Sequence, residues 1–133
     1  MRIAAAAFVG MLVLASAAEA RTWNIRPGAN AQADLQTAML DAHPGDTIAL
    51  ARGRFDLTQG LSLDVDRVTI RGAGQDKSVL SFAHQTRGAE GLLITSDQVM
   101  LRDFAVENTR GDAIKARDCH GITFHSVRAE WTA

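Results

Sequence analysis

The chain has 133 residues, with 14 Lys and Arg, 15 Asp and Glu, and a formal net charge of −1 at pH 7. This balanced charge gives no general attraction to nucleic acid or to an anionic membrane surface, so we expect neither as a partner. The single cysteine, Cys119, has no second cysteine with which to pair, which excludes disulfides within the chain as a source of stability.

The first twenty residues have the parts of a secretory signal. Met1 and Arg2 give a short positive start, residues 3–15 form an uncharged apolar run, and Ala18-Glu19-Ala20 supplies the Ala-x-Ala pattern read by signal peptidase. The apolar run is shorter than the about 20 residues that a transmembrane helix needs. We predict a cleaved signal over residues 1–20 and a periplasmic or secreted mature protein without a membrane span. The alternative is an uncleaved membrane anchor.

Residues 21–46 are expected to form an N-terminal segment with one capping helix. A helical stripe of apolar residues at i, i+3, i+4 and i+7 is made by Leu35, Ala38, Met39 and Ala42. Asn30 is in position to cap the start of this helix, and the His43–Asp46 turn ends it. A stack of strand repeats needs such a cover over its first repeat, where core and strand edge would otherwise be exposed.

From residue 47 to residue 133, apolar residues recur in three columns with steps of 20 to 31 residues. The columns are Leu61, Leu92 and Ile114; Ile48, Val68, Val99 and Ile122; and Phe55, Val79, Phe104 and Val127. Alternation at i and i+2 predicts short strands, and the step of three from Leu101 to Phe104 predicts a corner between two of them. A repeat near 23 residues has no room for a crossover helix, so each strand should pair with its counterpart one repeat earlier. This pattern predicts an all-β fold, a parallel β-helix of about three coils.

Two stretches carry a resemblance to a known family. LQTAMLDAHPGDTIALARGRFDL (residues 35–57) and LSLDVDRVTIRGAG (residues 61–74) resemble the opening of secreted proteins of the pectate-lyase-like superfamily. The resemblance covers residues 30–130 and is closest to a group of exported bacterial β-helix proteins rather than to a named enzyme. It implies a right-handed parallel β-helix, and it leaves open whether the protein is an enzyme of the polysaccharide lyase or epimerase kind.

Basic residues occupy equivalent outward positions in successive repeats. Arg71, Arg102 and His125 should lie in one column, about 4.8 Å apart, with Arg128 nearby on the next strand. Like charges in a column repel each other unless an anion neutralises them. We therefore expect these four residues to bind an acidic polysaccharide such as a uronan. The alternative is an ordinary solvated face with splayed side chains.

Residues 111–121 concentrate further polar side chains. Lyases of the superfamily need a base and a cation beside the uronate carboxylate, which makes Lys115, His120 and His125 the catalytic candidates. Asp97 and Asp118, in turns of neighbouring repeats, are candidates to hold a calcium ion. The alternative for each aspartate is turn chemistry, in which the carboxylate accepts hydrogen bonds from backbone N–H groups.

The end of the chain carries no recognisable cap. Trp131-Thr132-Ala133 directly follows the last predicted strand. We expect either that residues 47–133 are the first part of a longer solenoid, truncated at the C-terminus, or that the open end meets a partner chain. Two hypotheses follow: an exported protein that binds or processes an acidic polysaccharide, and a non-catalytic envelope scaffold that associates with another exported protein.

Overall fold

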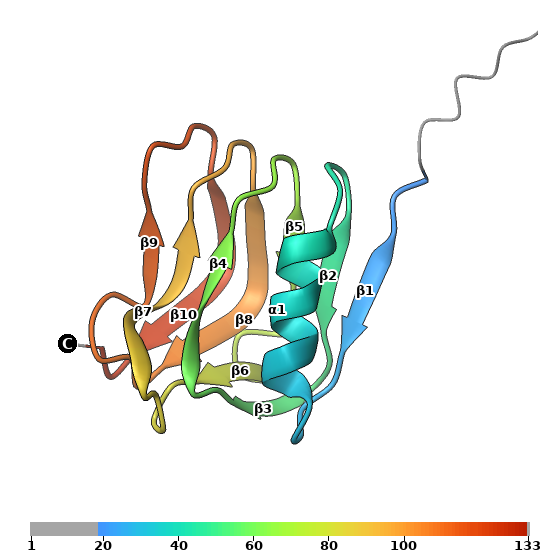
Figure 1. The fold of residues 1–133 in the computed structure, drawn as a ribbon. Helices are drawn as coiled ribbons and strands as arrows, with labels where there is room; N and C mark the ends of the chain where they lie inside the picture. Colours follow the sequence, from blue (N-terminus) through green and yellow to red (C-terminus); the bar gives the residue numbers. More distant parts are fainter. Residues whose placement is uncertain (1–18, 133) are drawn as a thin grey trace, which may run out of the picture.

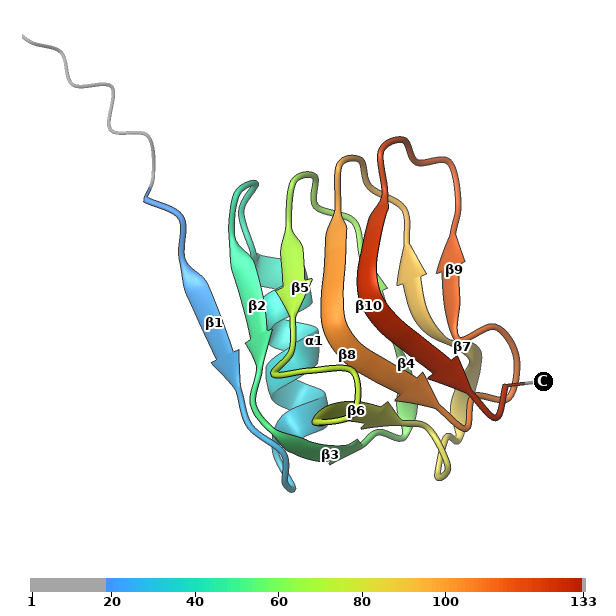
Figure 2. The same ribbon diagram turned by 180° about the vertical axis from the view of Figure 1, so that it is seen from behind.

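The computed structural model describes residues 19–132, where it contains ten strands and one helix (Figures 1 and 2). The signal predicted over residues 1–20 therefore lies almost entirely outside the described residues. No helix in the described part of the chain is long and apolar enough to cross a membrane.

The strands are short, and every pairing between them is parallel. They are β1 (Thr22–Ile25), β2 (Thr47–Leu50), β3 (Gly53–Asp56), β4 (Gln59–Leu63), β5 (Thr69–Arg71), β6 (Ser78–Ser81), β7 (Arg87–Ile94), β8 (Met100–Glu107), β9 (Ile114–Ala116) and β10 (Thr123–Glu130). The protein is thus largely β, built from parallel sheets and one helix, α1 (Ala31–Asp41).

Two open sheets contain these strands. The smaller has the order β4-β7-β9, and the larger joins β1-β2-β5-β8 to β6 and β3, with β10 paired along β8. Strand β8 joins both parts of the larger sheet because it bends. Its first half pairs with β5 and its second half with β6, and Asp103 between them has a left-handed φ of 61°. Ser126 has φ 52° at the matching place in β10, so both strands turn where the sequence predicts a corner.

The observed register confirms one predicted column and corrects the other two. Leu61, Leu92 and Ile114 are paired in succession, as predicted. Ile48, however, pairs with Ile70 and not with Val68. Val68 and Ile70 both point into the core, because residues two apart share a face, so the polarity pattern cannot distinguish the two registers.

The third column is wrong at Val79, because Phe55 pairs with Leu80 instead. The inward positions of β6 are Ser78 and Leu80, both buried, while Val79 is half-buried. The Ser78 hydroxyl lies 2.9 Å from the backbone oxygen of Ala51 and accepts the N–H of Ala73 at 2.8 Å. The core tolerates a serine at this position because its hydroxyl has these backbone partners.

Helix α1 packs beside β4, β1 and β3 (Figure 1). The four apolar residues of the predicted stripe are all buried. Asn30 precedes the helix, as expected, but its side chain makes no capping hydrogen bond. The Gln32 side-chain oxygen accepts the N–H groups of Thr58 and Gln59 at 2.9 and 3.2 Å. The helix thus satisfies backbone donors at the edge of β4, where a preceding strand would otherwise lie.

The opposite edge of the fold is formed by β10 and is exposed. Leu101 in β8 is fully buried, whereas Phe124, its register partner in β10, is 54% exposed. No other strand within residues 19–132 pairs with the outer edge of β10. An exposed apolar side chain therefore lies on the strand whose outer edge is unpaired within residues 19–132. Figure 2 shows the position of β10 beside β8.

Candidate anion-binding site

The register confirms the predicted basic column. Arg71 of β5 pairs with Arg102 of β8, and Arg102 pairs with His125 of β10. Ala49 of β2 and Asn24 of β1 continue the same line on the other side of Arg71. Neighbouring strands are about 4.8 Å apart, so these five positions form one row that crosses the strands.

The members of the column differ in how far they are neutralised. Arg102 donates from Nε to the carboxylate of Asp103 at 2.8 Å, within the bend of β8. Arg71 and His125 are exposed, and neither has a carboxylate within 4 Å in the described part of the chain. Arg71 is therefore the arginine of the column whose charge is left for a ligand.

Arg128 is surrounded by acidic groups rather than free for an anion. Its Nη1 lies 2.8 Å from Glu107 and 3.1 Å from Glu130, and its Nε lies 3.1 Å from Asp76. The Asp76 contact has ion-pair distance but not hydrogen-bonding geometry, since Nε has no hydrogen-bond partner. The bond to Glu107, followed by Glu130, raises the pKa of Arg128. These contacts favour a structural role for this residue over the substrate contact that the sequence suggested.

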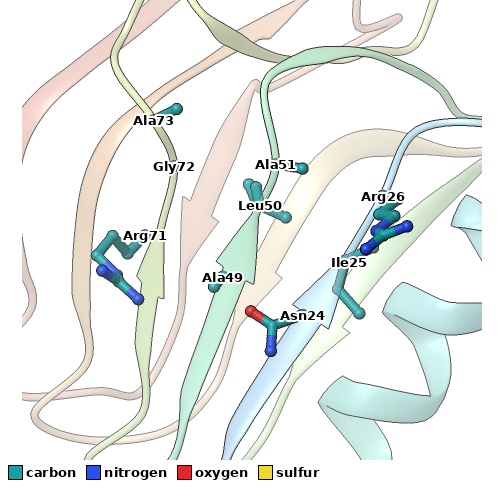
Figure 3. A pocket seen from close by; sticks show the side chains of 9 residues that line it. All are labelled: Asn24, Ile25, Arg26, Ala49, Leu50, Ala51, Arg71, Gly72 and Ala73. Carbon is teal, nitrogen blue, oxygen red and sulfur yellow. The ribbon is translucent and has the colours of Figure 1, made fainter.

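A shallow depression of about 430 Å³ lies beside the column, on β1, β2 and β5 (Figure 3). It is lined by Asn24, Ile25, Arg26, Ala49, Leu50, Ala51, Arg71, Gly72 and Ala73. Small alanines line its middle, and Arg71 and Arg26 lie on opposite sides of them (Figure 3). The lining contains two positive charges and no acidic side chain. Arg26, like Arg71, has no carboxylate within 4 Å among residues 19–132.

Sequence reasoning did not identify Arg26, because it assigned no strand to the residues before the helix. A signal was present in the stretch TWNIR. Trp23 and Ile25 alternate with Thr22, Asn24 and Arg26, which is the pattern of a strand with one buried face. The structure places β1 there, with Ile25 buried and Arg26 exposed.

The structure does not bring the three catalytic candidates together on one sheet. Lys115 lies on β9 in the three-stranded sheet, where its Nζ is 3.4 Å from Glu90. The pKa of Glu90 is lowered, first by a hydrogen bond from the backbone N–H of Glu90 and then by the bond from Lys115. His125 lies on β10 in the larger sheet, and His120 lies in the turn between the two strands. The candidate base His125 lies beside Arg102 in the row, whereas Lys115 lies on the other sheet and is paired with Glu90.

The two calcium candidates, Asp97 and Asp118, also have different surroundings. Asp97 accepts the backbone N–H of His120 at 2.9 Å, and its own N–H donates to Asp66 at 2.8 Å. Asp97 therefore links the turns of three successive repeats, as the turn-chemistry alternative predicts. Asp118 is exposed, with φ 51°. Across residues 19–132, no group of three or more His, Cys, Asp or Glu side chains is arranged to hold a metal ion.

Comparison with known proteins gives no match to a family model, a curated protein or a solved structure.

Proposed function

We propose that the chain is an exported right-handed parallel β-helix protein, periplasmic or secreted, which binds an acidic polysaccharide on the outer face of β1, β2, β5, β8 and β10. The observation that carries this proposal is the basic row across the strands, with the unneutralised arginines Arg71 and Arg26 beside a depression that lacks acidic groups.

The strand pairing supports the fold part of the proposal. Each strand of a repeat pairs in parallel with strands one repeat away, in three lines: β1-β2-β5-β8-β10, β3-β6-β8-β10 and β4-β7-β9. This winding through three lines of parallel strands is what a β-helix requires, and it supports the proposal together with the resemblance to the pectate-lyase-like superfamily. The sequence features of residues 1–20 support export.

The chemistry of the row favours carboxylates as the bound groups. The guanidinium of arginine makes two parallel hydrogen bonds to a carboxylate, which is stronger and more directional than a lysine contact. Because the basic positions repeat from strand to strand, a bound polymer would cross the strands rather than follow one of them. From β1 to β10 this path extends over four strand spacings, or about 19 Å. An extended uronan could meet a basic group at several points along it.

Binding of alginate and pectate to the wild-type protein tests the proposal. We expect Arg71→Ala and Arg26→Ala each to weaken binding about tenfold, since a hydrogen bond to a charged group contributes about 1.5–3 kcal/mol. We also expect binding to weaken as salt increases. Absorbance of unsaturated uronates during the same incubation would report a lyase. Arg110→Ala is the matched control, because it removes the same charge from an exposed position between β8 and β9. Wild-type protein that binds neither polymer would refute the proposal.

A second candidate function is that of a non-catalytic scaffold that pairs with another exported protein. The exposed edge of β10 favours it. A depression of about 390 Å³ there is lined by Ile114, Phe124 and Val127 among others, next to the unpaired strand edge. A partner that adds a parallel strand to β10 would cover both features. Sedimentation at increasing concentration, and with Phe124→Ser, tests the capacity for association. If the protein stays strictly monomeric and binds no protein from an extract of exported proteins, this counts against the scaffold function.

A further inference from the structure

Asp46, at the start of β2, is a buried carboxylate whose hydrogen-bond donors come from three places. Its side chain accepts the backbone N–H of Arg21 at 2.8 Å, the backbone N–H of His43 at 2.9 Å and the indole N–H of Trp23 at 3.1 Å. The residue is only 3% exposed. The donors from His43 and then Arg21 lower the pKa of Asp46 and so favour its charged form.

In the described part of the chain, no Lys, Arg or His side-chain nitrogen lies within ion-pair distance, 4 Å, of the Asp46 carboxylate. The three hydrogen-bond donors are two amides and an indole, and the His43 side chain acts on Asp46 only at longer range, where its charge is the smallest of the causes that lower the pKa of Asp46. Buried charges in proteins are normally paired with an opposite charge, because removing a lone ion from water is costly. The question is which cation would complete the site.

Strand β1 begins at Thr22, directly after Arg21, the residue whose amide contacts Asp46. The Arg21 carbonyl accepts the N–H of Thr47 at 3.0 Å, which opens the β1–β2 ladder, while residues 19 and 20 are exposed. The Arg21 guanidinium lies 3.6 Å from the centroid of the Trp23 ring, which further fixes this residue. The Ala-x-Ala pattern predicts signal cleavage after Ala20, between the exposed residues 19–20 and Arg21.

We propose that Asp46 is the receptor for the amino terminus that signal cleavage creates at Arg21. Hydrolysis adds one water across the Ala20–Arg21 peptide bond, leaving a carboxylate on Ala20 and an ammonium group on Arg21. The nitrogen that becomes the ammonium already lies 2.8 Å from Oδ1 of Asp46. Cleavage therefore converts a hydrogen bond between a neutral amide and the Asp46 carboxylate into a partly buried ion pair at the same position.

This inference rests on the export part of the proposed function and is independent of polysaccharide binding. Its consequence is that the processed protein is more stable than its precursor. The precursor lacks the ion pair, so its free energy of unfolding is lower during export. It gains the ion pair only after the signal has been removed.

The test begins with the amino-terminal residue of the exported protein, read by mass spectrometry. We expect Arg21, and a different first residue would overturn the proposal. The melting temperature of this chain is then compared with that of a chain beginning at Ala20, which carries the same charge one residue further away. We expect the Ala20 chain to melt about 3 °C lower, a shift typical of slightly under 1 kcal/mol in a domain of this size.

Asp46→Asn provides the matched control, because it keeps a hydrogen-bond acceptor and removes the charge. The difference between the two chain starts should vanish in this background, and a difference of unchanged size would refute the ion pair. Should the variant fail to fold, acylation of the Arg21 α-amino group in the unmutated protein decides the question. We expect acylation about tenfold slower in the folded than in the unfolded chain, whereas equal rates would overturn the proposal.

Discussion

Replacing Gly72 by alanine tests how closely β5 and β8 approach beside the basic column. Gly72 follows Arg71, and its φ is not in the left-handed region, so only space is at issue. An added Cβ would lie 2.8 Å from the Cβ of Ser78 and 2.9 Å from that of Phe104, and it would overlap the backbone oxygen of Asp103. Backbone atoms of the next strand cannot move aside without breaking the pairing that places Arg71 against Arg102.

The expected cost follows from two opposing effects. Overpacking destabilises by about 1–3 kcal/mol or more, and the loss of chain entropy in the unfolded state returns about 0.4–1 kcal/mol. We expect Gly72→Ala to lower the free energy of unfolding by about 2 kcal/mol and the melting temperature by about 8 °C. Thermal and urea unfolding followed by circular dichroism would measure both.

Gly111→Ala is the matched control, since its φ is also outside the left-handed region. The nearest atom to an added Cβ there is the Cβ of Ala89 at 3.2 Å, a tight contact that a small shift relieves. We expect a change of under about 0.5 kcal/mol, as for ordinary surface substitutions. If Gly72→Ala and Gly111→Ala were equally stable, the inference that β5 and β8 approach too closely for a side chain at residue 72 would be wrong.

Three further predictions concern acid, the core and an ion-pair cluster. The backbone N–H of His43 is the main cause of the lowered pKa of Asp46, so the stability that Asp46 contributes is present above its unfolded pKa of about 3.9 and is lost as pH falls through the lower folded value. Asp46→Asn should therefore flatten the decline of melting temperature below about pH 4. Phe104→Ala should cost about 4 kcal/mol in urea unfolding because the ring is fully buried, whereas Phe124→Ala, at a ring 54% exposed, should cost far less. Arg128→Met should lower the free energy of unfolding by about 1–2 kcal/mol, because Glu107 and Glu130 are left without the cation between them. This variant should bind uronan as well as the Arg110→Ala control does.

The basic column could be predicted because each of its strands carries an apolar residue at a fixed distance before the outward basic residue. Val68, Val99 and Ile122 precede the outward residues by a fixed three positions, so a polarity pattern is enough to align Arg71, Arg102 and His125. The register of β2 was missed for the opposite reason. Val68 and Ile70 are successive inward positions and equally apolar, so the polarity pattern could not show that Ile48 pairs with Ile70.

The burial of polar residues could not be predicted from local sequence. Asp46 is stabilised in the core by donors up to 25 residues away, and the Ser78 hydroxyl binds a backbone oxygen 27 residues away. A window of neighbouring residues contains the local donors His43 and Ala73 but neither of these distant partners. The same limit applies to Arg26, whose relevance depends on Arg71 lying two strands away across a row of alanines.

Neutralisation by neighbouring carboxylates should rank the arginines of the site, and this ranking is a further test. Arg102 is bonded to Asp103 at 2.8 Å, so a ligand must compete with that carboxylate, whereas Arg71 has no such competitor within residues 19–132. We therefore expect Arg71→Ala to weaken uronan binding about tenfold and Arg102→Ala only two- to threefold, measured by titration at one salt concentration. Asp103→Asn keeps a hydrogen-bond acceptor at the bend of β8 but removes its negative charge. We therefore expect this variant, whose basic column is unchanged, to bind uronan more tightly than the wild-type protein. If Arg102→Ala were the more damaging substitution, the ligand would be centred on β8, and the depression between Arg71 and Arg26 would not be the place where the polymer is held.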